Sequence, residues 1–179
     1  MKKIRDMTIG ELAAFVSTQL SMNGIDCTLT GGACISIYTN NKYESFDLDF
    51  IESGQFPQKK TEDILNGIGF YKENRYFKNK QTKYFIEFPS GPLSIGSEPV
   101  ERYKEMEFET GKLKLLTPTD SVKDRLAAYY HWDDKQSLEQ AILVCLDQKI
   151  NMKEIEKFSA DEGMIEKFNV IKRRLLNRK

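Results

Sequence analysis

The chain has 179 residues, 40% hydrophobic and 30% charged, which is the ordinary composition of a soluble globular protein with a buried core. Lys plus Arg and Asp plus Glu both number 27, so no net charge draws the chain to nucleic acid or to an anionic membrane. No apolar run has the length of a membrane span or a signal peptide, so we expect a cytoplasmic protein without a membrane partner. The single histidine, His131, argues against a structural zinc site or a Ser-His-Asp centre.

Helix and strand signals alternate over the first two-thirds of the chain. Thr8 and Glu11 form a capping box before apolar residues at helical spacing, and Asn23-Gly24 ends that helix. The next expected elements are a strand over 26–30, a short helix over 33–38, a strand over 45–51 and a helix over 59–66. Three β segments between 69 and 88, a loop over 89–99 and strands near 104–109 and 112–116 follow.

The last third of the chain has only helix signals. Thr117 is a helix N-cap, followed by a proline at the first helical position and an acid in the first turn. Further helix starts are expected at three places: Asp133 or Asp134, Asn151 with Glu154, and Ser159 with Glu162. We therefore predict an α+β protein, with an α/β core over 1–116 and a helical C-terminal region over 117–179 packed on that core.

Two aspartates interrupt an apolar strand in the segment Phe-Asp-Leu-Asp-Phe, residues 46–50. Because successive side chains of a strand face opposite ways, Phe46, Leu48 and Phe50 suit a core, while Asp47 and Asp49 share the other face. Their Cβ atoms would lie roughly 6.6–6.8 Å apart, so both carboxylates could reach one Mg²⁺ or a pair of ions. An isolated pair of this kind is more often the wet face of an amphipathic strand.

Two further features favour a functional interpretation of the aspartates. Gly31-Gly32 follows a strand and precedes a short helix, where glycines let backbone N–H groups approach a phosphate. Glu87 interrupts a later apolar strand, and if that strand lies beside 45–51 it completes a cluster of three carboxylates. Like charges packed together repel unless a cation lies between them. The sequence therefore predicts a site for Mg²⁺ or Mn²⁺ held by Asp47, Asp49 and Glu87.

A glycine pair, an Asp-x-Asp on the next strand and an acid inside a later strand resemble the pattern of the nucleotidyltransferase superfamily, the DNA polymerase beta-like fold. The segments TGGACISIY, SFDLDFI, EFPSGPL and LTPTDSVKDRLAAYYHW look like the small bacterial branch related to abortive-infection nucleotidyltransferase toxins. This resemblance covers residues 28 to about 145. It implies a nucleotidyltransferase-like mixed β-sheet with flanking helices, followed by the helical C-terminal region.

The resemblance also implies an activity, which is the Mg-dependent transfer of a nucleoside monophosphate from an NTP to an acceptor hydroxyl. The acceptor would belong to RNA, protein or a small molecule. The expected biological role is that of a toxin or phage-defence component, with a cognate antitoxin as partner. A non-catalytic nucleotide- or RNA-binding module with the same fold is the alternative, although a degenerate copy would be expected to lose one of the carboxylates.

The resemblance assigns roles to individual residues. Gly31 and Gly32 would contact the triphosphate, and the three acids would hold the metal and act in catalysis, Glu87 taking the proton of the acceptor. Ser45, on the same strand face as Asp47, would bind a phosphate or orient a carboxylate. Lys123 would bind the nucleotide and act in catalysis, with Arg125 as the less favoured choice.

The sequence departs from the superfamily pattern and leaves some segments open. Ala33 follows Gly32 where many members have Gly-Ser, and the third acid is a glutamate rather than the commoner aspartate. The loop over 88–96 would either close over a nucleotide or simply connect strands, and Trp132 is expected to be a packing residue. Six basic residues between 167 and 179 either contact RNA or form a solvated helix end.

Overall fold

The computed structural model describes residues 2–176 of the chain. These residues contain a seven-stranded mixed sheet with the strand order β3-β4-β5-β2-β1-β9-β8. Its strands are β1 (Cys27–Thr30), β2 (Asp47–Glu52), β3 (Tyr71–Glu73), β4 (Tyr76–Lys78), β5 (Phe85–Glu87), β8 (Tyr103–Phe108) and β9 (Gly111–Leu116). A separate hairpin is formed by β6 (Ser94–Ile95) and β7 (Glu98–Pro99).

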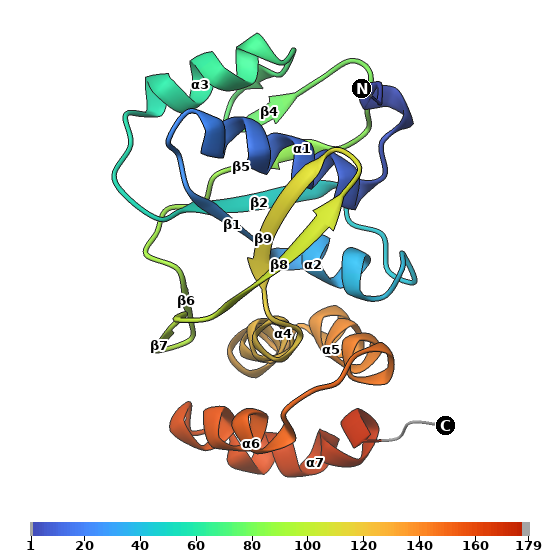
Figure 1. Ribbon diagram of the computed structural model, residues 1–179. Helices are drawn as coiled ribbons and strands as arrows, with labels where there is room; N and C mark the ends of the chain where they lie inside the picture. The colour runs from blue at the N-terminus through green and yellow to red at the C-terminus, as the bar shows by residue number, and fades with distance from the viewer. Residues whose placement is uncertain (1, 177–179) are drawn as a thin grey trace.

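Helices surround the sheet and form the end of the chain (Figure 1). A short 3-10 helix, η1 (Ile4–Asp6), precedes them. The α-helices are α1 (Ile9–Met22), α2 (Gly31–Tyr38), α3 (Gln58–Gly67), α4 (Pro118–Trp132), α5 (Lys135–Asp147), α6 (Met152–Asp161) and α7 (Ile165–Leu176). The two faces of the sheet differ in chemistry, and this difference positions the site.

One face of the sheet is part of the hydrophobic core. The alternation of β1 and β2 turns Leu29, Leu48 and Phe50 to this face, where all three side chains are fully buried. Ile86 of β5 and Leu115 of β9 extend the same apolar surface along the neighbouring strands. Helix α1 contacts β1 and β9 on this side (Figure 1). The opposite face of β1, β2 and β5 therefore carries the polar residues.

The four last helices form two layers at one end of the sheet (Figure 1). Helices α4 and α5 contact each other and α2, and α6 and α7 cover them on the outside. Tyr130 connects the layers, since its hydroxyl lies 2.8 Å from Ser159 Oγ of α6 and its carbonyl accepts a hydrogen bond from Lys167 Nζ of α7. The helical region is thus packed through a buried polar contact as well as through apolar side chains.

The β6–β7 hairpin is attached to this helical region. Both the backbone N–H and the hydroxyl of Ser97 donate to Glu162 Oε1, at 2.8 and 2.6 Å, and His131 Nε2 lies 2.9 Å from Glu162 Oε2. On the next strand Glu98 Oε2 accepts from Lys123 Nζ at 3.2 Å. The segment between β5 and β8 therefore reaches down to the helices and returns to the sheet.

The α+β class expected from the sequence is confirmed, with β9 ending at Leu116 and α4 beginning at Pro118. The helix starts at Thr8, Asp134 and Asn151 are also confirmed by their side-chain caps. No helix within residues 2–176 combines the length and the apolar character that a bilayer crossing requires.

Four local expectations are wrong. Phe46 precedes β2 and is 43% exposed instead of joining the core, and Trp132 is 82% exposed at the end of α4. Ser159 does not cap a helix, because it lies inside α6 and hydrogen-bonds the carbonyl of Ile155. A two-stranded hairpin stands where the sequence indicated only a loop.

Three basic residues of α7 are engaged with the neighbouring helices. Lys167 donates to Tyr130, Lys172 to Glu156 at 2.9 Å and Arg174 to Glu139 at 2.6 Å. These contacts favour the solvated-helix interpretation over RNA binding for this segment. The last two basic residues of the run, Arg178 and Lys179, lie outside the described residues.

Candidate active site

Strand pairing brings the three acids to one face of the sheet. In the parallel pair of β2 and β5, Asp49 lies opposite Glu87, and Asp47 is the preceding residue on the same face of β2. Thr30 of β1 pairs with Asp49, and Tyr76 of β4 pairs with Glu87. The acids therefore occupy the centre of a polar row that crosses four strands of the sheet.

Ser45 fixes the first of these carboxylates. Its hydroxyl donates a short hydrogen bond to Asp47 Oδ1, and its own backbone N–H donates to Ser36 Oγ of α2 at 2.8 Å. The Ser45 side chain is buried. Of the two roles expected for this serine, the structure places it where it orients a carboxylate.

The glycine pair is required by the close approach of α2 to the acids. Gly31 begins α2 with φ +68°, and a Cβ at this position would overlap Asp49 Oδ2. A Cβ on Gly32 would lie 2.8 Å from Ser45 Oγ. Only residues without a side chain allow the helix N-terminus to lie against both Asp49 and Ser45. This N-terminus also brings the positive end of the helix dipole toward the carboxylates.

The pKa of Asp49 is raised by its surroundings in this row of acids. Burial is the main cause that raises it to about 7, and the charges of Asp47 and Glu87 raise it further. The charge of Arg125 acts in the opposite direction. The carboxylates are thus close enough to repel one another, and a cation among them would lower the free energy of the folded state.

Two arginines supply positive charge at the acids. Arg75, in the turn between β3 and β4, lies with Nε 3.2 Å from Glu87 Oε1, and its guanidinium is 4.9 Å from the centroid of the Tyr76 ring. Arg125 of α4 contacts Asp124 Oδ2 at 2.6 Å and Gln140 Oε1 of α5 at 3.3 Å. Arg75 could not be expected from the sequence, because it is distant from the acids along the chain and belongs to no motif.

Lys123 is not brought together with the acids. Its Nζ lies 3.2 Å from Glu98 Oε2 and 3.5 Å from Asp120 Oδ1, and it is 5.8 Å from the centroid of the Phe158 ring. Two residues along a helix turn the side chain by about 200°, so Lys123 and Arg125 point to different sides of α4. Arg125, the less favoured choice, is the cation of this segment whose charge reaches Asp49, where the charge of its neighbour Asp124 acts in the opposite direction. Asp120 lies three residues before Lys123 on the same helix, which is a spacing that favours this local ion pair.

The donor set fits a hard divalent cation. Carboxylate oxygens are the ligands that Mg²⁺ and Mn²⁺ prefer, and three of them share one sheet face beside a glycine cradle. Among residues 2–176, however, no three His, Cys, Asp or Glu side chains converge as a ready set of metal ligands. Glu87 is paired with Arg75 and Asp47 with Ser45. Glu87 must therefore leave Arg75 before it can join an ion shared with the aspartates.

Comparison with known proteins shows the fold. No protein-family model matches the chain, and no curated protein matches its sequence. An antigenic nucleotidyltransferase-like protein from Paracoccidioides brasiliensis matches with a TM-score of 0.61 and 11% identity, over 93% of this chain and 91% of its own. The antibiotic-resistance factor ANT(2″)-Ia in solution matches with a TM-score of 0.53 and 11% identity, over 92% and 95%. Its crystal structure with adenylyl-2″-tobramycin matches with 0.51 and 12%, over 83% and 92%.

At such identities the similarity concerns the fold, and the fold is that of nucleotidyltransferases. The coverage on both sides means that the sheet and the helical region are compared together, since α4 to α7 make up the last third of the chain. This similarity assigns no role to any individual residue of the chain.

We expect Gly31→Ala to destabilise the protein by about 1–3 kcal/mol, because the new Cβ meets Asp49 Oδ2 and the backbone stays at positive φ. Chemical denaturation measures the loss. Gly163→Ala is the matched control, since Gly163 also has a positive φ, of +70°, but a Cβ there meets no atom within 4 Å. An equal effect of both substitutions would contradict the close approach of α2.

We expect metal-free Asp49→Asn to be more stable than the parent above pH 7, by on the order of 2 kcal/mol after allowance for the water that still reaches the carboxylate. Below about pH 4 this carboxyl is protonated in both folded and unfolded chains, so the difference vanishes. Between pH 4 and pH 7 the unfolded chain ionises this carboxyl while the folded parent keeps its proton, so the stability of the parent falls over this range and levels off above pH 7, where both states are ionised.

Denaturant unfolding in EDTA from pH 4 to pH 9 measures this difference. Glu107→Gln, at a side chain with 77% exposure, serves as the control and should show no such trend. A stability gap between Asp49→Asn and the parent that is independent of pH would refute the raised pKa.

We expect Arg75→Gln to strengthen Mn²⁺ binding by roughly two- to fivefold, because the guanidinium competes with the ion for Glu87 and an exposed ion pair of this kind is weak. Isothermal titration calorimetry measures the affinity. Arg102→Gln is the control, because Arg102 pairs with Glu154 at 2.8 Å, away from the acids. Weaker Mn²⁺ binding by Arg75→Gln would show that the arginine supports the ion instead.

Proposed function

We propose that this chain, which has the nucleotidyltransferase fold, transfers a nucleoside monophosphate from an NTP to an acceptor hydroxyl. The observation that carries the proposal is the row of Asp47, Asp49 and Glu87 on one sheet face, directly beside a helix that begins with two glycines. Three acids on a partly buried surface have no structural benefit by themselves, since their charges raise the pKa of Asp49. A divalent cation and a triphosphate turn this unfavourable cluster into a binding site.

Each part of the row has a proposed role. Asp47, oriented by Ser45, and Asp49, seated over Gly31, hold the ions that bind the triphosphate. The backbone N–H groups at the start of α2 bind phosphate oxygens. When bound, Mg²⁺ or Mn²⁺ neutralises the triphosphate and polarises its α-phosphorus.

The reaction requires a proton acceptor and a leaving group. The acceptor hydroxyl attacks the α-phosphorus, an oxygen–phosphorus bond forms, and the bond to pyrophosphate breaks. Glu87, once released from Arg75, takes the hydroxyl proton, and pyrophosphate leaves with the negative charge. Arg125, whose charge reaches Asp49, faces the same site from α4 and lowers the cost of the accumulated negative charge. Catalysis by this site is mainly positioning and charge neutralisation.

Arg125 replaces Lys123 as the cation of α4 that we assign to the nucleotide. Tyr43, whose pKa is raised by burial and by the charge of Asp47, lies on the same side as Arg125. Gln136 Nε2 of α5 donates to the hydroxyl of Tyr43 at 3.5 Å. These groups form a polar wall between the acids and the helical region, where the nucleoside part of an NTP would lie. A role for Lys123 in the site is still a proposal, and it rests on the family resemblance of this segment of α4.

The biological part of the proposal follows from the sequence resemblance. Four segments between residues 30 and 132 look like abortive-infection nucleotidyltransferase toxins, so we assign the chain to a toxin or phage-defence role with a cognate antitoxin. Controlled expression in a bacterial host tests this role, with arrested growth as the expected result. Growth that continues at the rate of an Asp47→Asn strain would contradict it.

One observation favours a second function. Arg75 pairs with Glu87 and neutralises a carboxylate that would otherwise hold the ion, which is the arrangement expected of a nucleotide- or RNA-binding module that has lost turnover. In that case the fold and the glycine cradle would serve binding alone. The two functions differ in one measurable respect, which is the fate of the α-phosphate.

We expect the purified protein, incubated with α-labelled NTPs, Mg²⁺ or Mn²⁺ and cell extract, to move label into an RNA, protein or small-molecule fraction. Asp47→Asn and Asp49→Asn should each reduce the transfer at least about 100-fold, because each removes a charge that holds the ions. Glu107→Gln is the control that should keep full transfer. NTP binding without label in any fraction would establish the binding module instead.

A further inference from the structure

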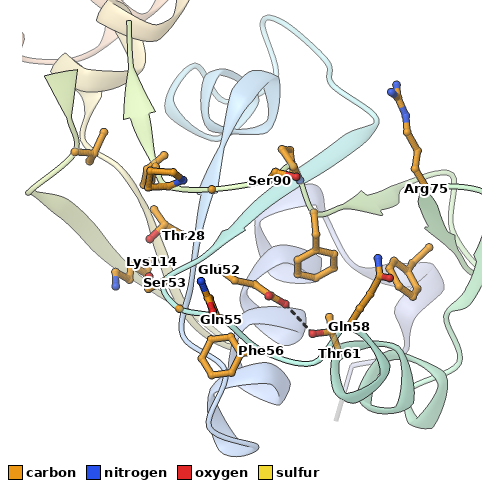
Figure 2. A pocket seen from close by; sticks show the side chains of 18 of the residues that line it. Thr28, Glu52, Ser53, Gln55, Phe56, Gln58, Thr61, Arg75, Ser90 and Lys114 are labelled. Carbon is orange, nitrogen blue, oxygen red and sulfur yellow. Dashed lines mark hydrogen bonds between the residues drawn. The ribbon is translucent and has the colours of Figure 1, made fainter. Parts of the chain in front are cut away.

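A large cleft lies beside the carboxylate row and is separate from it. Its volume is about 1110 Å³, above the usual range of roughly 300–1,000 Å³ for small-ligand sites. Thr28 of β1, Glu52 of β2 and Lys114 of β9 contribute from the sheet, residues 53–56 and 88–93 contribute from two loops, and Gln58 contributes from the start of α3. Figure 2 shows Lys114 and Arg75 on opposite sides of the view, with Glu52, Gln55 and Phe56 between them.

The register of the sheet places this cleft next to Glu87. Thr28 pairs with Ile51, which is the next residue after Asp49 on the polar face of β2. Arg75 lines the cleft and is also the ion-pair partner of Glu87. The glycines of α2 and the two aspartates are absent from the lining. A nucleotide held at the start of α2 would therefore leave this cleft open on the other side of the acids.

The lining combines cations with aromatic rings. Lys114 Nζ is 3.9 Å from the centroid of the Tyr103 ring, and Lys72 Nζ is 5.9 Å from that of Phe77. Arg75 is the third cation. Phe56 and Phe88 add further apolar rings to the lining. Cations beside ring faces suit a ligand that carries both phosphate and a flat base.

The negative charge in the lining is limited and already engaged. Glu52 is the one acidic side chain among the lining residues, and its Oε1 accepts a hydrogen bond from Thr61 Oγ1 at 2.7 Å. The counter-ions of the lysines lie outside the lining, with Asp26 2.6 Å from Lys114 and Glu62 3.5 Å from Lys72. A polycationic acceptor such as an aminoglycoside would thus meet three cations and one occupied carboxylate.

We propose that this cleft is the acceptor site and that the acceptor is a phosphate-bearing nucleotide, either free or at the end of a single-stranded RNA. The proposal rests on the proposed nucleotidyltransferase function. Lys114 and Arg75 bind phosphates at the two sides of the cleft, and the exposed ring of Tyr103 stacks on a base. Arg75 becomes available for a phosphate when Glu87 turns toward the aspartates, so the acceptor hydroxyl arrives where Glu87 receives its proton.

The test measures binding without turnover. Fluorescence anisotropy follows a short labelled single-stranded RNA on the full-length Asp47→Asn variant with Mg²⁺, with AMP and tobramycin as competitors. We expect Lys114→Gln to weaken RNA binding at least about fivefold and to reduce the slope of log affinity against log salt concentration by about one, since one phosphate contact is lost. Lys112→Gln, on the same strand with a side chain 75% exposed and outside the lining, should change neither.

The outcomes separate the possible sources of the ligand. Displacement of RNA by AMP identifies a free nucleotide as sufficient, and binding of RNA that AMP does not displace identifies an RNA end. Absence of binding by both RNA and AMP, tobramycin binding tighter than either, or equal effects of Lys114→Gln and Lys112→Gln would each overturn the proposal. Thermal unfolding of both variants verifies that they are folded.

The experiments also distinguish a failure of the acceptor-site proposal from a failure of the proposed catalytic function. RNA binding that depends on Lys114 in a protein that transfers no label would retain the cleft as a nucleotide site and remove the catalytic function. Label transfer that is insensitive to Lys114→Gln would retain the catalytic function and remove the cleft as acceptor site.

Discussion

The main physical constraint on the candidate site is the repulsion among three carboxylates on one face of the sheet. Asp47, Asp49 and Glu87 share that face because β2 and β5 run parallel in a register that sets Asp49 opposite Glu87. Burial of Asp49 intensifies the effect, since water screens the charges less than it would at a surface strand. The opposite face of β2 buries Leu48 and Phe50, so the strand cannot turn over to relieve the repulsion without exposing these two side chains. The core thus holds the acids in place.

The surroundings of the acids compensate for this repulsion in graded ways. A hydroxyl holds Asp47, a helix N-terminus without side chains lies against Asp49, and an exposed guanidinium pairs with Glu87. The first two are rigid, because they depend on buried Ser45 and on Gly31. The third is mobile, since the Arg75 side chain is 69% exposed and an exposed ion pair is weak. Binding of a cation to the row would therefore change the position of Arg75 more than that of Ser45 or Gly31.

Features set by neighbouring residues could be predicted from the sequence, and features set by distant packing could not. The cap at Thr8 and the two opposite faces of β2 each depend on residues a few positions apart in the sequence. Both predictions agree with the structure. The Arg75–Glu87 pair and the cleft depend on which strands become neighbours, and no local pattern records that choice. The family resemblance favours Lys123 over Arg125, and no local pattern records which side of α4 faces the acids. Ser159 has the spacing of a cap yet lies inside α6, where the buried Tyr130 hydroxyl is its partner.

The attachment of the β6–β7 hairpin links two parts of the molecule mechanically. The chain that leaves β5 forms one wall of the cleft and is then fastened to the last helices through Ser97 and Glu162 and through Glu98 and Lys123. A shift of α6 relative to the sheet would therefore be transmitted through the β6–β7 hairpin to the wall of the cleft. We therefore expect a ligand that displaces α6 to alter the width of the cleft as well.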